Sequence, residues 1–108
     1  MYSKIPFEHN TLTELTDEQI AEAKKEYEHI FMLTVDDKKC YIHKPTRMVI
    51  DLAVQSAAKR SSMFDETILK NCWLAGDKEI VEVDEYFYAV SKQIDEVVKF
   101  KTAELKKL

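Results

Sequence analysis

Only one of the 108 residues is a glycine and only two are prolines, which restricts the turns that this chain can form. Glycine and proline are the residues that most often end helices and strands and reverse the chain. We therefore expect mostly helices with short connections. The same scarcity excludes the glycine-rich loops of dinucleotide-binding and P-loop enzymes, because both motifs need several glycines.

The size and charge of the chain indicate one domain without general affinity for polyanions. A length of 108 residues suits a single domain that buries a core without disulfides or metals. The 16 basic and 20 acidic residues give a net charge of −4, so nucleic acid and anionic membranes would not attract it. No apolar run approaches the ~20 residues that cross a bilayer. With no signal-peptide pattern and only two cysteines, we expect a reduced, cytoplasmic protein without membrane contact.

The N-terminal residues differ from the rest of the chain. Residues 1–15 have no clear period and contain Pro6, yet they carry several apolar side chains. We predict an N-terminal arm over residues 1–15 that docks on its own domain or on a neighbour. A single α+β domain then covers residues 16–108. Thr16 is its first N-cap, with Gln19 three residues later as the capping-box partner.

Two short runs rich in β-branched and aromatic residues predict a β-hairpin. The runs are IFMLTV and CYIH, and the polar residues DDKK separate them. Such composition favours strands, and the lack of Asn-Gly or Asp-Gly favours a four-residue loop over a tight turn. Because two strands alone are marginally stable, helices should cover one face.

Further helices are expected after the hairpin. Thr46 is the N-cap of one that is apolar over more than half its circumference, and we expect that helix to be central and buried. Ser62, or the serine before it, begins the next helix, and Gly76 stands where that helix would stop in a left-handed conformation. The last helix runs from about Asp84 to Lys107 and spans about 36 Å, so its end is a candidate for oligomer or partner contact. The predicted fold is α+β and helix-dominated: a short β-hairpin packed against about four helices, with a long C-terminal helix.

The stretch KNCWLAGD, residues 70–77, gathers rare residues and could mark an active site. Cys72 would be the nucleophile, but nothing in the sequence brings a histidine to it, and a cysteine in an apolar helix is usually a core residue. A metal site is the other alternative, with Cys40, His43, His29 and Cys72 as candidate ligands. However, Cys40 and His43 point to opposite faces of a strand, and structural zinc needs a second clear pair. We expect no catalytic, cofactor or metal site, and hence a non-enzymatic protein.

Several aromatic residues exceed what one small core needs. We predict that these residues contact a partner: Phe7, Tyr86, Tyr88 and Phe100. The alternative is that they are ordinary surface aromatics. A basic group around Lys44 and Arg47 could indicate nucleic-acid binding, but the surrounding charge is acidic and a solvated face is favoured.

From Lys39 onward, the order of features resembles that of small phage and prophage proteins similar to tail assembly chaperones. A strand, a proline and a helix start are present in KKCYIHKPTRMVIDLA, a second helix in FDETILKNCWLAGD, and a final helix in DEYFYAVSKQIDEVVKF. The resemblance covers about residues 30–105. It rests on this fold pattern with Lys44-Pro45-x-Arg47 and Asn71-Cys72-Trp73, and it includes no catalytic signature.

The resemblance implies a non-enzymatic assembly protein that acts in the cytoplasm of the infected host cell. Such a protein would bind tape-measure or tail-tube proteins transiently, keep their apolar surfaces soluble, and self-associate as a homo-oligomer. Two alternatives remain open: a small virion-associated structural protein and, less favoured, a nucleic-acid-binding regulator.

Overall fold

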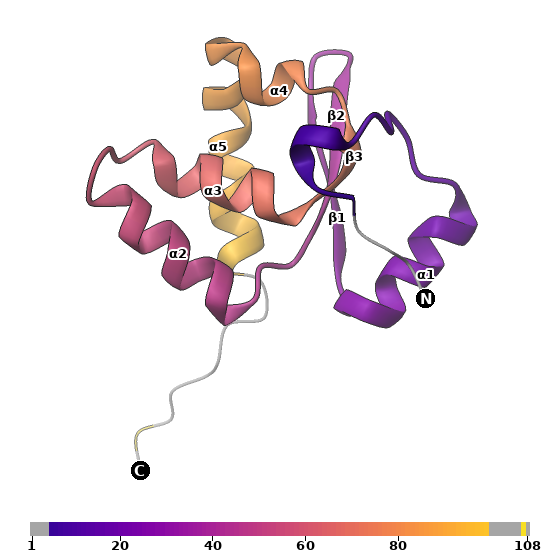
Figure 1. The fold of residues 1–108 in the computed structure, drawn as a ribbon, viewed down its shortest axis with the longest axis horizontal. Helices are drawn as coiled ribbons and strands as arrows, with labels where there is room; N and C mark the ends of the chain where they lie inside the picture. The colour runs from indigo at the N-terminus through magenta and orange to yellow at the C-terminus, as the bar shows by residue number, and fades with distance from the viewer. Residues whose placement is uncertain (1–4, 100–106, 108) are drawn as a thin grey trace.

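A three-stranded antiparallel sheet with helices on both sides forms the middle of the fold (Figure 1). The computed structural model describes residues 5–99 and 107. The elements are η1 (Phe7–His9), α1 (Asp17–Tyr27), β1 (Ile30–Val35), β2 (Lys38–His43), α2 (Arg47–Ala57), α3 (Met63–Cys72), β3 (Trp73–Gly76), α4 (Glu79–Glu82) and α5 (Asp84–Lys99). The predicted helix-dominated α+β class with a long C-terminal helix is confirmed. The predicted continuation of that helix over residues 100–106 lies outside the described residues.

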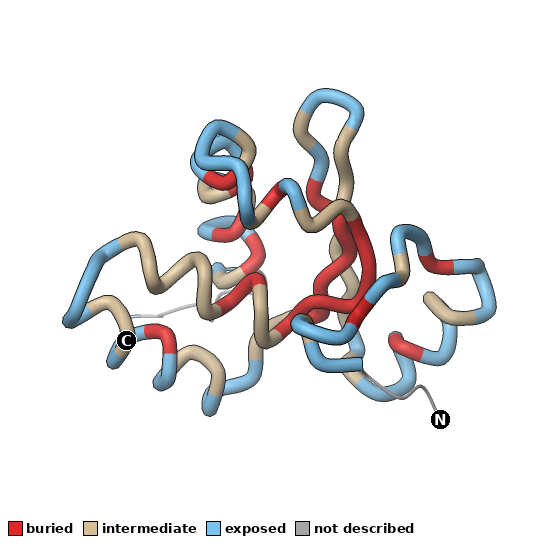
Figure 2. The backbone as a smooth tube through the Cα atoms, turned by 45° about the horizontal axis from the view of Figure 1, so that its top comes forward, coloured by how far each residue is buried: buried red, intermediate tan, exposed pale blue. Residues whose placement is uncertain are grey.

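The sheet separates two groups of helices, as Figure 1 shows. On the α1 side, a small buried cluster contains Leu15, Ala23, Tyr41, Leu74 and Ala75. On the other side, α3, α4 and α5 enclose a larger core that includes Leu33, Cys40, Ile42, Ile68, Leu69, Cys72, Trp73, Ile80, Phe87, Val90, Ile94 and Val97. Buried residues follow the middle of the sheet and the inner turns of these helices (Figure 2). Consecutive residues of β2 thus contribute to different clusters, because their side chains point to opposite faces of the sheet.

The starts of the first two long helices are as predicted. The Thr16 side chain accepts a hydrogen bond from the Gln19 N–H, and the Thr16 N–H donates one to the Gln19 side-chain oxygen, which completes the capping box. The Thr46 side chain accepts from the Val49 N–H at the start of α2. Ser62 is the residue before α3, but its side chain makes no capping hydrogen bond.

The prediction that α2 is central and buried is wrong. α2 packs mainly on α3 at the outside of the fold, and Ala53 is its only buried residue. The reason is that α3 and α5 already fill the face of the sheet with side chains such as Ile68 and Ile94. α2 therefore has a neighbour for one of its apolar sides and solvent on the other.

The prediction that a helix continues to Gly76 is also wrong. α3 ends at Cys72, and β3 begins at the next residue and pairs antiparallel with β2. Gly76 has a φ of 145°, and a Cβ added to it would lie 2.4 Å from the Cα of its strand partner Cys40. The single glycine of the chain thus permits the close approach of two strands rather than ending a helix.

The hairpin loop is tighter than the predicted four residues. Only Asp36 and Asp37 connect β1 to β2, which begins at Lys38. Asp36 has a φ of 52°, a conformation that aspartate adopts more readily than most residues. Lys38 and Lys39 therefore belong to the strand and not to the loop.

The described part of the N-terminal arm packs on its own chain. The Asn10 side-chain amide donates a 2.9 Å hydrogen bond to the Leu74 carbonyl, and the Leu12 carbonyl accepts a 2.9 Å bond from the Gly76 N–H. The arm thereby lies along the outer edge of β3. Residues near the start of the chain are thus bonded directly to an outer strand of the sheet, more than sixty residues away in the sequence.

Candidate protein-binding surface

The predicted contact residues lie on separate parts of the molecule. Phe7 is half-buried in η1, and Tyr86 is half-buried on α5. Tyr88 is 63% exposed, and its ring centroid lies 5.7 Å from that of Phe87. Phe100 lies outside the described residues. The structure therefore does not bring Phe7, Tyr86 and Tyr88 into one groove.

Phe7 is held by its own domain. Its ring meets the buried Trp73 edge-to-face, with centroids 5.2 Å apart. The ammonium groups of Lys70 and Lys78 lie 5.6 and 4.9 Å from the centre of the Phe7 ring. The aromatic contact holds the arm on β3, and the two cation–π contacts hold it on α3 and on the residue that precedes α4.

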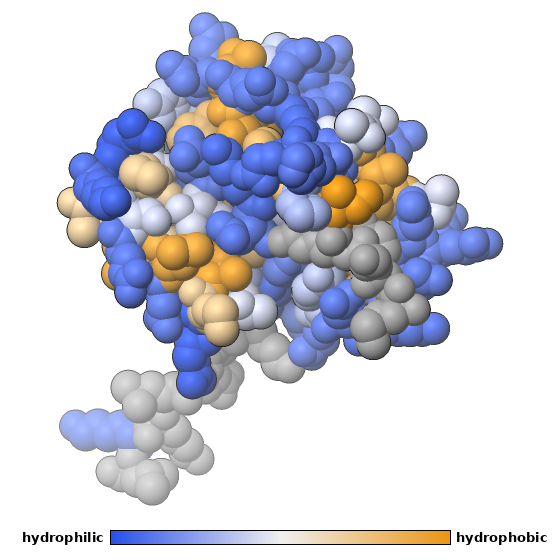
Figure 3. Space-filling model, in the orientation of Figure 1, coloured by the Kyte–Doolittle hydropathy of each residue, from blue (hydrophilic) through white to orange (hydrophobic). Residues whose placement is uncertain are grey.

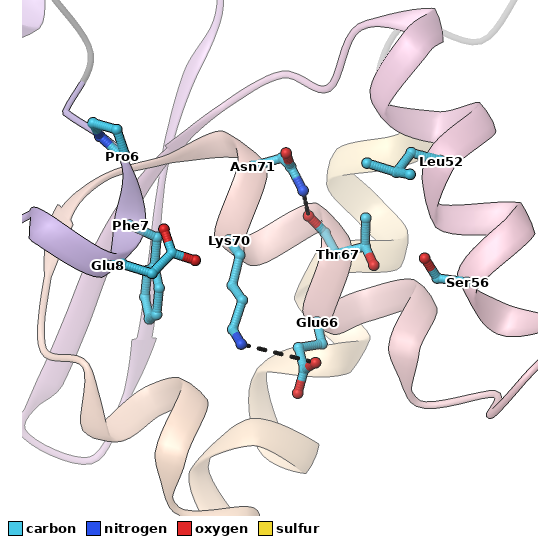
Figure 4. A pocket seen from close by; sticks show the side chains of 9 residues that line it. All are labelled: Pro6, Phe7, Glu8, Leu52, Ser56, Glu66, Thr67, Lys70 and Asn71. Atoms are coloured by element: carbon cyan, nitrogen blue, oxygen red, sulfur yellow. Dashed lines mark hydrogen bonds and ion pairs between the residues drawn. The ribbon is translucent and has the colours of Figure 1, made fainter.

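A groove of about 430 Å³ opens between the arm, α2 and α3 (Figure 4). Its lining residues are Pro6, Phe7, Glu8, Leu52, Ser56, Glu66, Thr67, Lys70 and Asn71. The Lys70 ammonium lies 3.9 Å from a Glu66 carboxylate oxygen, and the Asn71 amide donates to the Thr67 carbonyl. Lys70 and Glu66 offset each other, and Glu8 leaves the lining with one net negative charge. The specificity of the groove would therefore come mainly from its shape and from apolar contact.

The solvent side of α2 carries large apolar side chains beside this groove. Met48 is 80% exposed, Val54 57% and Leu52 45%. Met48 and Leu52 are four residues apart and hence neighbours on one side of the helix, and Leu52 also lines the groove. Apolar residues are grouped over α2 on the face seen in Figure 3. We call Met48, Leu52 and the adjoining groove the α2 surface.

The prediction of contact residues did not include the α2 surface. The signal was present, because a helix apolar over more than half its circumference needs neighbours on more than one side. We assigned all of those neighbours to the protein's own core. A comparison of the apolar area of α2 with what a 108-residue chain can cover would have indicated an exposed side.

A second groove, of about 230 Å³, lies between β1 and α5. Phe31, Met32, Leu33, Gln93, Glu96 and Val97 line it. The Gln93 side-chain amide forms hydrogen bonds with the backbone of Thr34 in both directions, at 2.8 Å to the carbonyl and 3.3 Å from the N–H. A side chain thus replaces the next strand at this point of the β1 edge.

Both cysteine thiols lie in the core. Cys40 and Cys72 are fully buried, and burial raises the pKa of Cys40 to about 12. A thiol with such a pKa stays protonated at neutral pH and is a poor nucleophile. His43, which faces the other side of the sheet, stacks on Tyr27 with ring centroids 3.9 Å apart.

The described residues, 5–99 and 107, contain neither a cluster of metal-ligating side chains nor a membrane-spanning helix. Within that range, no cluster of histidine, cysteine and carboxylate side chains is suited to hold a metal ion. No helix in the same range is long and apolar enough to cross a bilayer.

Comparison of the chain with known protein families, characterised proteins and solved structures finds no match.

Proposed function

We propose that this protein is a non-enzymatic assembly factor that binds an apolar segment of another protein. By its resemblance to tail assembly chaperones, that protein is a phage tape-measure or tail-tube component. The observation that supports the proposal is the exposed apolar side of α2. Because the fold leaves Met48 and Leu52 exposed, an apolar surface is available for another protein.

The mechanism is shielding. Methionine is unbranched and adapts to irregular apolar surfaces, so Met48 suits the capture of segments whose sequences differ. The groove beside Leu52 can accept one larger side chain of the bound segment, while the polar rim of Ser56, Thr67 and Asn71 bonds to its backbone or to water. A partner helix held there would keep its apolar side out of water until assembly.

The test is co-expression with the tape-measure protein encoded in the same phage or prophage genome. We expect the wild-type chain to co-purify with it and to raise its soluble fraction. The double variant Met48→Lys/Leu52→Lys should weaken binding by about tenfold or more, because it places two charges in the contact. The matched control is Met32→Lys, the same change at a methionine exposed on β1.

Two results would contradict the proposal. One is a wild-type chain that neither binds nor solubilises the tape-measure and tail-tube proteins. The other is a double variant that binds as well as the wild type while remaining folded by circular dichroism. Mass spectrometry of purified particles separates a transient chaperone from a structural protein, since only the latter remains in the virion.

A further inference from the structure

The sheet has one covered edge and one open edge. The strand order is β1-β2-β3, so β1 and β3 are the outer strands. The arm covers β3 through the bond from the Gly76 N–H to the Leu12 carbonyl. β1 is therefore the edge that another strand could extend.

The pairing register identifies which residues of β1 face outward. In an antiparallel pair, alternate residues direct their N–H and C=O groups toward the partner strand. The Lys44 N–H bonds to the His29 carbonyl, so His29 and the odd-numbered residues of β1 bond to β2. The even-numbered residues, Ile30, Met32 and Thr34, direct their backbone groups away from the sheet.

Only one of these outward residues has a partner in the described part of the chain. Gln93 bonds to both backbone groups of Thr34. The backbone groups of Ile30 and Met32 have no corresponding partner among residues 5–99. On the N-terminal side, Glu28 has a φ of 69° and turns the chain away, so the open edge is short.

We propose that a second copy of this chain pairs with β1 along this edge, antiparallel, about a two-fold axis at Phe31. In that register Ile30 of each copy faces Met32 of the other, and each such pair exchanges N–H···O=C bonds in both directions. Thr34 is not required, so the bonds from Gln93 remain in place. The register thus satisfies the open backbone groups and disturbs no existing bond.

The side chains support a second copy as the occupant. The strand IFMLTV has no charge, proline or glycine, and edges that avoid pairing usually carry such residues. Phe31 would face its own equivalent in a non-hydrogen-bonded pair, where side chains come closest and aromatic pairs are favourable. A longer partner strand would have to displace Gln93, whereas the short self-complementary edge fits another copy of itself.

The same geometry limits the affinity. A two-fold axis perpendicular to the sheet places both α5 helices on one face, so the groove lined by Val97 in each copy opens toward the other. Glu96 stands in both grooves, and the two carboxylates repel each other. We therefore expect a weak dimer that dissociates on dilution and becomes tighter as added salt screens this repulsion.

Sedimentation of the full chain from about 10 µM to about 1 mM tests the proposal, a range that spans weak interfaces. The wild type should change from monomer toward dimer. Met32→Lys, at a side chain that is 55% exposed, and Met32→Pro, which removes the outward N–H but no N–H that bonds to β2, should each raise the dimer Kd by about tenfold or more. Met48→Lys on α2 is the matched control and should leave the Kd unchanged.

Cross-linking tests the register. Phe31→Cys should form a disulfide between copies in oxidising buffer, because the Cα atoms of a non-hydrogen-bonded pair lie about 4.5 Å apart, within the range that a disulfide spans. Tyr88→Cys, at an exposed aromatic residue on α5, should not. A wild type that stays monomeric up to about 1 mM, or a dimer that both Met32 variants leave intact, would overturn the proposal. Either outcome is independent of tape-measure binding through α2.

Discussion

Replacement of Gly76 by alanine tests the close approach of β2 and β3. The added Cβ would lie 2.4 Å from the Cys40 Cα, 2.5 Å from the Cys40 Cβ and 2.7 Å from the Lys39 carbonyl oxygen. Carbon atoms in contact prefer about 3.5–4.0 Å. Most of the atoms in the way belong to the backbone, so the clash is relieved only if the strands separate.

The expected cost follows from three effects. A positive φ costs alanine about 1–2 kcal/mol, and crowding in a packed interior costs about 1–3 kcal/mol. Alanine also lowers the conformational entropy of the unfolded chain, which stabilises the folded state by about 0.4–1 kcal/mol. The free energy of unfolding should therefore fall by about 1–5 kcal/mol, compared with the roughly 5–15 kcal/mol typical of a domain.

Urea denaturation gives the measurement. Trp73 is the only tryptophan and lies in the same strand, so its fluorescence reports the separation of β3, and circular dichroism reports the helices. Asp36→Ala is the matched control, because Asp36 also has a positive φ but is exposed in a loop, and only the conformational cost should appear. If Gly76→Ala loses less than about 0.5 kcal/mol, the reasoning is wrong, since surface substitutions alone produce changes of that size.

Three other substitutions have defined outcomes. Asn10→Ala leaves the buried Leu74 carbonyl without its donor, so we expect a loss of about 1–3 kcal/mol in denaturant titration and faster hydrogen exchange at the start of the chain; unchanged stability would contradict this. Glu28→Gly relieves a strained φ of 69° and should raise the melting temperature, because strain of about 1–3 kcal/mol exceeds the entropy cost of glycine; a lower melting temperature would refute it. Burial raises the pKa of Asp65, so the folded chain binds this proton more tightly than the unfolded chain, and the ionised carboxylate opposes folding at neutral pH. Asp65→Asn should therefore be more stable than wild type at pH 7, and the difference should disappear as acid protonates the carboxyl; a difference that grows in acid would reverse the argument.

The features that the sequence predicted correctly depend on local chemistry. The capping box at Thr16 involves residues three apart, and its hydrogen bonds form whatever the rest of the chain does. The alternation of Cys40 and His43 across β2 likewise follows from strand geometry alone. Helix-rich composition with few glycines also led to the correct fold class.

The features that were missed depend on distant partners. β3 is four residues long, is buried on both faces and follows a helix directly, so no alternation or turn residue marked it. Its existence depends on β2 and on the arm. The exposure of α2 was missed for a related reason, because periodicity shows which side of a helix is apolar but not what covers that side. The α2 surface could not be predicted for the same reason, because the exposure of a helix side depends on which distant parts of the chain cover it.

The contact between the arm and β3 also bears on how relatives of this protein should be recognised. The resemblance to tail assembly chaperones begins after the arm, yet the arm supplies the Asn10 amide to Leu74 and the Leu12 carbonyl to Gly76. A chain that shared only the later pattern would leave an edge of its sheet without partners. True relatives should therefore carry a segment that replaces these bonds, even where its sequence and its position in the chain have diverged.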